Sequence, residues 1–331
     1  MTTPRRLCAT AVAVAAVVAA AAMAGCSSAS STATATSALA PAAASPTPTP
    51  TTTEIPHWPL TITAANGPVT IKGLPQRIVS LDPTATEDLY AVGAGAQVVA
   101  VDQNSDFPPG APVTSLSGVT PDVAAIARYH PSLVISQYHA GLAASLAELG
   151  IPLLIEPEVY NLRDAYAQIE QIGLAAGHGY QAGEIVTNMR QVITDAVAQA
   201  GTKYRGLSFY WETAADPHLS VTSATLIGHI MDLFGLRDIA DVANAPGGIH
   251  PALTSDYIVA AKPQLIFLAD NDPADGGQAP AVVAARAGWA AIPAVKNHAI
   301  FGLNDDIASR WGPRLPQLVE EIAAALGTLK S

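Results

Sequence analysis

Patterns of β-strands that alternate with short helices occur in two separate stretches of this chain, and a purely helical stretch, Leu162 to Ala200, lies between them. Alternation of this kind is typical of βαβ units, whose strands lie parallel in one sheet. We therefore expect an α/β protein with two αβ lobes, mostly parallel sheets and one long bridging helix. The predicted strands are 77–81, 98–101, 131–136 and 152–155 in the first stretch and 207–210, 265–268 and 299–301 in the second.

The spacing of apolar residues predicts helices around these strands. From Ile185 to Val197, apolar side chains recur at helical spacing and form one stripe. Asn66-Gly67 between two short alternating runs predicts a β-hairpin over 60–72. Thr84 and Glu87 have capping-box spacing, which predicts a helix N-terminus there. That helix ends at Ala91, and the other predicted helices are 121–129, 140–149, 162–176, 181–200, 226–234, 256–260 and 315–326.

Residues 1–25 have the parts of an export signal. Arg5-Arg6 is cationic, residues 7–22 are apolar almost throughout, and Met23-Ala24-Gly25 leads into Cys26. This pattern resembles the lipobox of bacterial lipoproteins, in which the cysteine is acylated and becomes the new N-terminus. It implies a protein at the cell membrane, lipid-anchored on the extracytoplasmic face. An ordinary secretory signal or a retained N-terminal helix is the alternative, and export by the Sec or the twin-arginine route stays open.

The segment 26–56 is rich in Ser, Thr, Ala and Pro, and residues 27–53 carry neither a charge nor an aromatic ring. Such a segment cannot bury enough apolar surface to offset its ordering entropy, so we expect a disordered tether. Whether it is O-glycosylated stays open. The expected organisation is a lipoprotein signal peptide at 1–25, the tether at 26–56, an N-terminal αβ lobe at 57–176, a bridging helix at 177–202 and a C-terminal αβ lobe at 203–331.

Composition excludes several classes of function. The chain has 16 basic and 27 acidic residues and a net charge of −11, which argues against binding to nucleic acid. Both cysteines, Cys8 and Cys26, lie in or directly after the signal, so the remainder offers no thiol to a disulfide, a metal or a nucleophile. The sequence has no Gly-x-Ser-x-Gly elbow and no Walker loop, so we expect no enzyme and no cofactor. Its eight histidines include no i, i+4 pair, and we expect no directly bound metal.

Several segments, taken in order, carry a resemblance to one family. They are Pro75-Gln76-Arg77-Ile78-Val79-Ser80-Leu81 with Thr86-Glu87 after it, the loop 101–108, the segment 127–135, the lysine-proline-strand segment 260–266, the segment 289–297 and Gly312-Pro313-Arg314. This set resembles the class III periplasmic substrate-binding proteins of ABC importers for iron-siderophores, haem and cobalamin, over about residues 58–327. The resemblance implies a monomer with a shallow interlobe cleft, which delivers its ligand to a permease with an ATPase behind it.

Polar and aromatic residues that follow the predicted strands are the candidates for this cleft. In parallel sheets, ligands lie beyond the carboxyl ends of the strands, and flat rings with a few polar groups suit a large chelate. Tyr138 and Trp211 could instead be core residues, and Arg310 could simply pair with Asp305 or Asp306. The candidate ligand-binding residues are Asp82, Pro83, Thr84, Asn104, Gln137, Tyr138, His139, Trp211, Glu212, Asp270, Asp306, Arg310 and Trp311.

The expected function is that of a lipid-anchored solute-binding component that binds a ferric siderophore of low net charge. Haem or cobalamin bound by the same mechanism is the alternative, and an envelope adaptor that has lost transport is an alternative of another class. Cobalamin binders of the family tend to place aromatic rings near Asn104 and Gly118, where this chain has none. Family members commonly meet permease arginines through an acidic residue on each lobe. Here Asp232 and Asp122 are the candidates, although Ala124 occupies the matching position in the first lobe.

Overall fold

The first lobe contains a sheet of five parallel strands in the order β5-β4-β3-β6-β7. The computed structural model describes residues 57–137, 140–243, 248–273 and 277–329. The strand β3 is central and buried along its whole length, so the chain that leaves it emerges in the middle of the sheet's carboxyl edge. The elements of this lobe are β3 (Ile78–Ser80), α1 (Pro83–Ala91), β4 (Val98–Asp102), β5 (Val113–Leu116), α2 (Val123–Ala127), β6 (Leu133–Ser136), α3 (Ala140–Glu148) and β7 (Leu153–Ile155), with a 3₁₀ turn at Gly95–Gln97.

A β-hairpin precedes this sheet, as the sequence predicts. Strands β1 (Leu60–Ala64) and β2 (Gly67–Ile71) pair antiparallel, with Ala64 opposite Gly67. The turn is therefore Ala65-Asn66, one residue earlier than the Asn-Gly pair suggests. The side chain of Asn66 explains the shift, because it donates to the carbonyl of Leu153 at 2.9 Å and accepts from the amide of Ile155 at 3.1 Å, which fastens the hairpin to β7.

The second lobe repeats the architecture with a parallel sheet in the order β11-β8-β13-β14. A small antiparallel sheet, β12-β10-β9, extends from the end of β8 and was not predicted. The elements are β8 (Ser208–Glu212), β9 (Ala214–Ala215), β10 (His218–Leu219), α6 (Leu226–Leu233), β11 (Arg237–Asp238), β12 (Ala252–Leu253), α7 (Ser255–Ala261), β13 (Leu265–Leu268), α8 (Pro280–Ala284), α9 (Pro293–Lys296), β14 (Ile300–Gly302), α10 (Asp305–Ser309) and α11 (Leu315–Gly327), with 3₁₀ turns at Ala240–Val242 and Trp289–Ala291.

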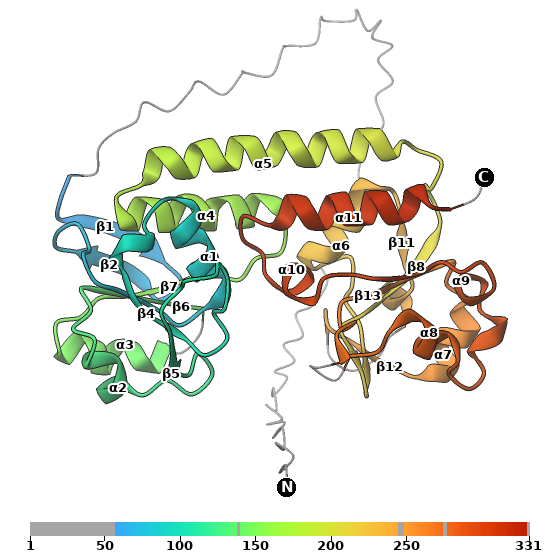
Figure 1. Ribbon diagram of the computed structural model, residues 1–331, viewed down its shortest axis with the longest axis horizontal. Helices are drawn as coiled ribbons and strands as arrows, with labels where there is room; N and C mark the ends of the chain where they lie inside the picture. Colours follow the sequence, from blue (N-terminus) through green and yellow to red (C-terminus); the bar gives the residue numbers. More distant parts are fainter. Residues whose placement is uncertain (1–56, 138–139, 244–247, 274–276, 330–331) are drawn as a thin grey trace, which may run out of the picture. The chain divides into compact units, whose positions relative to one another are not determined.

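The helix α5 (Gly179–Ala200) connects the two lobes. It packs against α4 (Leu162–Ala176), which follows the first sheet, and against α11, which ends the second lobe (Figure 1). Gly177 separates α4 from α5 and takes a φ of 82°, a left-handed conformation that glycine adopts at little cost. The expected fold of two αβ lobes bridged by one long helix is thus confirmed. The lobe boundaries given above stay a prediction, and the signal and tether, residues 1–56, lie outside the described residues.

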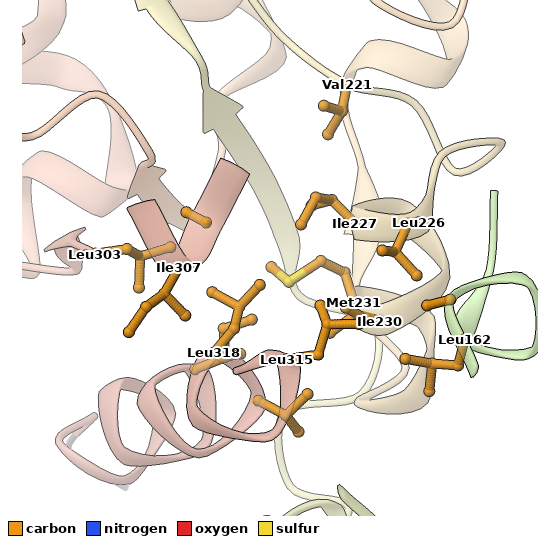
Figure 2. Packing of buried hydrophobic residues seen from close by; sticks show 14 of the residues in the cluster. Leu162, Val221, Leu226, Ile227, Ile230, Met231, Leu303, Ile307, Leu315 and Leu318 are labelled. Atoms are coloured by element: carbon orange, nitrogen blue, oxygen red, sulfur yellow. The ribbon is translucent and has the colours of Figure 1, made fainter. Parts of the chain in front are cut away.

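One continuous apolar core runs through both lobes and the helices between them. In Figure 2, Leu162 at the start of α4 lies beside Leu226 and Ile230 of α6, while Leu315 and Leu318 of α11 pack from the other side. A second cluster fills the other face of the first sheet, around Val79, Val134 and Leu146 (not shown in the figure). Within the part of the chain that the structure describes, no helix is both long and apolar enough to cross a membrane.

The capping-box prediction is wrong in one respect. The N-cap of α1 is Asp82, whose carboxylate accepts from the amides of Thr84, at 2.6 Å, and Ala85, at 3.4 Å. Pro83 occupies the first helical position, where its missing N–H costs nothing. Glu87 consequently does not turn back to a cap. Its carboxylate is free to bind partners from the other lobe.

Candidate functional site

Two arginines of the second lobe reach into the first lobe. We call the contact zone the seam; it consists of residues 82–88 and 104–107 on one side and residues 304–314 on the other. Arg310 is only 9% exposed. Its guanidinium donates to Glu87 at 3.2 Å, to Asp106 at 3.0 Å and to the carbonyl of Asn104 at 3.2 Å. Arg310 thereby binds two separate segments of the other lobe at once.

Arg310 is also held by its own lobe. Its guanidinium lies 2.7 Å from the carboxylate of Asp306, four residues earlier in the chain. Asn304 caps α10 by accepting from the amide of Ile307, which sets the direction of this turn. Burial lowers the pKa of Arg310, but Asp306, Asp106 and Glu87 outweigh burial, so the pKa is raised overall and the guanidinium stays charged.

Arg314 forms the second connection across the seam. Its guanidinium makes two hydrogen bonds to Glu87, at 2.7 Å from Nε to Oε2 and 2.5 Å from Nη2 to Oε1. The same guanidinium lies 4.1 Å from the ring centre of Phe107, a cation–π contact. Glu87 is 2% exposed, so this is a nearly buried carboxylate shared by two cations. Sequence reasoning identified Arg310 but missed Arg314 and Glu87 as site residues, although both lie in the family-like segments quoted above.

The second lobe has its own buried ionic cluster at the end of β8. Glu212 is fully buried, and Arg286 donates to its two oxygens at 2.5 Å and 2.6 Å. The hydroxyl of Tyr210 donates to Glu212 at 3.0 Å, and Gln278 accepts from Arg286 at 2.8 Å. Trp211 is also fully buried, and its ring stacks on Phe267 with 6.0 Å between ring centres. Trp211 and Glu212 thus face the interior of the lobe in this structure.

The seam contains seven of the candidate residues. Two further candidates, Trp211 and Glu212, are buried in the second lobe. Asp270 lies near them, half-buried; burial, with the charge of Glu212 adding to it, raises its pKa to about 7. Gln137 follows β6 and is half-buried, while Tyr138 and His139 lie outside the described residues. The candidates at the seam are Asp82, Pro83, Thr84, Asn104, Asp306, Arg310 and Trp311.

An open pocket of about 760 Å³ lies on the second lobe beside the Glu212–Arg286 pair. Alanine side chains and Val282 form half of its lining, and the other half is His218, Ser255, Gln278, Arg286 and Trp289. Trp289 is buried, as a packing residue would be, and its indole N–H donates to Ser255 at 2.8 Å.

Among the described residues, no group of three or more His, Cys, Asp or Glu side chains has the arrangement of a metal site.

The two candidate permease contacts are both exposed. Asp122 is the N-cap of α2, and its carboxylate accepts from the amide of Ala125 at 2.9 Å. Asp232 lies near the C-terminus of α6 on the second lobe. Ala124 is exposed as well, so the position expected to match the family's acidic residue presents only a methyl group.

Comparison with known proteins agrees with this architecture. The family model described as periplasmic binding protein matches residues 78–307. An uncharacterized ABC transporter substrate-binding lipoprotein, YvrC of Bacillus subtilis, is 31% identical over 280 residues, which cover 81% of this chain and 86% of the relative. A vitamin B12-binding protein of Pectobacterium atrosepticum is 28% identical and covers 78% of this chain and 90% of the relative.

Solved structures show the same fold. An ABC-type Fe³⁺-hydroxamate transport system protein from Saccharomonospora viridis superposes with a TM-score of 0.66 and 21% identity, covering 82% of this chain and all of the other. The fold and the family model point to the same family. The parallel sheets and the bridging helix are the fold of these relatives, and the family match covers most of the described chain. This protein belongs to the periplasmic binding protein family, as a class III substrate-binding protein of the ABC importer type and not an enzyme.

Proposed function

We propose that this protein binds a ferric siderophore of low net charge at the seam and delivers it to the permease of an ABC importer. The observation that carries the proposal is Arg310, a buried and charged guanidinium that contacts both lobes and shares the seam with six other candidate ligand residues. A guanidinium donates readily to hydroxamate or carboxylate oxygens. A ligand that enters the seam would exchange the contacts of Arg310 with Asp106 and Asn104 for its own oxygens.

The charge balance at the seam supports a ligand of low charge. Arg310 and Arg314 face the carboxylates of Glu87, Asp106 and Asp306, so the ion pairs alone leave no surplus of positive charge. A strongly anionic catecholate complex would meet three carboxylates and only two cations among these paired groups. A neutral or weakly charged chelate avoids this repulsion and can still accept hydrogen bonds from Arg310.

Cobalamin is the second candidate, favoured by the relatives that are named vitamin B12-binding proteins. One local feature weighs against it. A Cβ atom at Gly118 would lie 2.4 Å from the carbonyl oxygen of Leu81 and 2.9 Å from the carboxylate of Asp102. An aromatic ring at position 118, which cobalamin binders tend to have, therefore cannot be accommodated on this backbone.

We further propose that acylated Cys26 anchors the protein to the extracytoplasmic face of the membrane and that Asp232 and Asp122 contact the permease. The Bacillus subtilis relative is named a substrate-binding lipoprotein, which supports the anchor. The exposure of both carboxylates supports the contacts. An envelope adaptor that has lost transport would share the anchor, and only recovery of a permease with the protein, abolished by Asp232→Ala, would exclude that alternative.

The test of ligand class is a fluorescence titration. Trp311 is half-buried at the seam, so a ligand bound there should quench tryptophan emission. We expect quenching by a ferric hydroxamate siderophore and weaker or no quenching by a ferric catecholate, haem or cobalamin. Arg310→Met should lower the affinity at least about tenfold, the loss of a charge-assisted hydrogen bond.

The matched control for this titration is Arg190→Met, because Arg190 lies on α5 over the ring of Tyr166, outside the seam. It should bind like the unmodified protein. Tight binding of cobalamin, and of no other panel member, would make cobalamin the ligand in place of a ferric siderophore. A folded protein that binds no member of the panel would refute the siderophore proposal.

A further inference from the structure

Three carboxyl groups are buried together in the first lobe, two of them in the seam. Asp82 and Asp88 belong to the start and the body of α1, and Glu156 directly follows β7. Their exposed fractions are 4%, 0% and 1%. Oδ2 of Asp82 and both oxygens of Asp88 have no hydrogen-bond partner among the described protein groups, while the side chain of Gln168 lies close enough to Glu156 to favour its charged form. Buried carboxylates without partners are costly when they are charged, so these groups favour the neutral, protonated form.

The carboxylates around Asp88 and Glu156 also favour the protonated form, because their charges raise the pKa of each group. Burial and then the charges of Glu156, Asp82 and Glu87 raise the pKa of Asp88 well above its usual value. Burial and the charge of Asp82 raise the pKa of Glu156, against a smaller opposing effect of Gln168 from α4.

Asp82 itself is less strongly affected. Burial raises its pKa to about 6, with the amides of Thr84 and Ala85 opposing, Asp102 adding and Arg310 opposing. Of the cations at the seam, Arg310 opposes the rise in the pKa of Asp82. Asp88 and Glu156 are therefore the two groups that hold protons most strongly.

The second lobe covers Asp88, whose charge is coupled to that of Glu156. A Cβ atom added at Gly312 would lie 3.0 Å from Oδ1 of Asp88 and 3.4 Å from a methyl carbon of Thr84. The backbone at Gly312 therefore lies directly over the Asp88 carboxyl. On either side of Gly312, Arg310 and Arg314 bind Glu87, the neighbour of Asp88 in α1. If the lobes separate here, the cover leaves and water reaches Asp88.

We propose that closure of the seam is coupled to protonation of Asp88 and Glu156, so that acidity holds the lobes together and their separation releases protons. The physical basis is linkage. A carboxyl that is neutral when covered and ionised when hydrated binds a proton only in the closed state. Acidity therefore favours closure, and this contribution is lost as the pH rises through the pKa of the closed state.

The size of the effect follows from the number of protons. Between the ordinary carboxyl pKa and that of the closed state, each proton taken up on closure changes the open-to-closed ratio by roughly tenfold per pH unit. The proposed binding function gives this device its use, because ligand entry and release at the seam both require the cover to move. The inference rests on that function only in this respect.

The test follows the opening of the seam in the ligand-free protein. Amide hydrogen exchange is measured for residues 84–92 and 310–315 at pH 6 and pH 8 and is corrected for the intrinsic dependence of exchange on pH. We expect the corrected exchange of both segments to be at least roughly tenfold faster at pH 8. In the double variant Asp88→Asn, Glu156→Gln, neutral amides replace the protonated carboxyls, so both segments should stay slow at both pH values.

The matched control is Asp238→Asn. Burial raises the pKa of Asp238 to about 7, but this residue belongs to β11 and lies outside the seam. This variant should retain the full pH response of the seam segments. If the double variant does not fold, each single variant should lose about half of the logarithmic response.

Two results would overturn the proposal. One is an unchanged pH response in a folded double variant. The other is closure by KCl or CaCl₂ at fixed pH to the extent that acid produces, since a cation would then neutralise the carboxylates. Salt alone should instead weaken the seam by screening its ion pairs. Because no ligand is added, a failure here leaves the siderophore proposal intact, and a failure to bind siderophores leaves this one intact.

Discussion

Glu87 of the first lobe and Arg314 of the second are joined by two parallel hydrogen bonds, at 2.7 Å and 2.5 Å, and Arg310 shares the same carboxylate. Glu87 lies more than two hundred residues from both arginines in the sequence. A nearly buried carboxylate between two guanidinium groups links the lobes at a second place, apart from the bridging helix.

Removing this carboxylate should destabilise the protein. Glu87→Gln leaves the buried Arg310 and the half-buried Arg314 without their shared carboxylate, and breaking a buried ion pair costs about 3–5 kcal/mol. We expect this loss in the free energy of unfolding, measured by urea titration. Asp195→Asn is the matched control, since its pairing with Gln191 is exposed on α5; it should change stability by less than about 0.5 kcal/mol. A Glu87→Gln protein as stable as the control would show that the pair contributes nothing net.

The Glu212–Arg286 pair should behave as a unit. Arg286→Met should destabilise the second lobe by about 3–5 kcal/mol, because it leaves a fully buried carboxylate unpaired. Adding Glu212→Gln should restore most of the loss, since the remaining amide is neutral. The measurement is a double-mutant cycle by thermal or urea unfolding. Additive losses in the double variant would contradict the interpretation of the two residues as a coupled pair.

Two glycines lie in contrasting surroundings, so replacing each by alanine should change the stability of the protein in opposite directions. Gly118→Ala should destabilise by about 1–3 kcal/mol, because the new methyl group would lie 2.4 Å from the carbonyl oxygen of Leu81. Gly183→Ala should stabilise by about 0.5–1 kcal/mol, because Gly183 lies inside α5 with no atom within 4 Å of the added carbon. Unfolding temperatures of the two variants measure both effects. A neutral Gly118→Ala would mean that the backbone at this position yields easily.

Asp238 should make stability depend on pH near neutrality. Burial raises its pKa from 3.8 to about 7, with the amide of Ala240 opposing and Asp241 adding. The native state then holds a proton that the unfolded state releases, so this group lowers stability as the pH rises from about 4 through about 7. Asp238→Asn should therefore raise the unfolding temperature at pH 8 and leave it nearly unchanged at pH 4. An equal effect at both pH values would assign the stabilisation to packing instead of ionisation.

The alternation of strand and helix patterns was sufficient to predict the fold, because buried parallel strands such as Leu265–Leu268 and long amphipathic helices such as Leu162–Ala176 carry strong local signals. Elements that depend on their neighbours were missed. The strand β5 has only one buried residue, Leu116, and β9, β10 and β12 are two residues each. Such short or exposed strands form because an adjacent strand is present, which no local pattern reveals.

The site was predictable to a smaller degree. Placing candidates after strand ends brought Asp82 and Asn104 to one side of the seam, because the carboxyl ends of parallel strands meet at one edge of the first sheet. The partners of Arg310 in the first lobe could not be read from the sequence, since they lie more than two hundred residues away. The burial of Trp211 depends equally on distant packing, here against Phe267.

The attachment of α5 to both α4 and α11 limits how this protein can signal that it is loaded. A helix that packs against a helix of each lobe lets the lobes tilt slightly but not move far apart. A permease that docks such a binding protein cannot detect bound ligand by a large displacement of the lobes. If a ligand binds at the seam as proposed, the permease would instead sense the surface of the seam, where ligand atoms would replace the hydrogen-bond partners of Arg310.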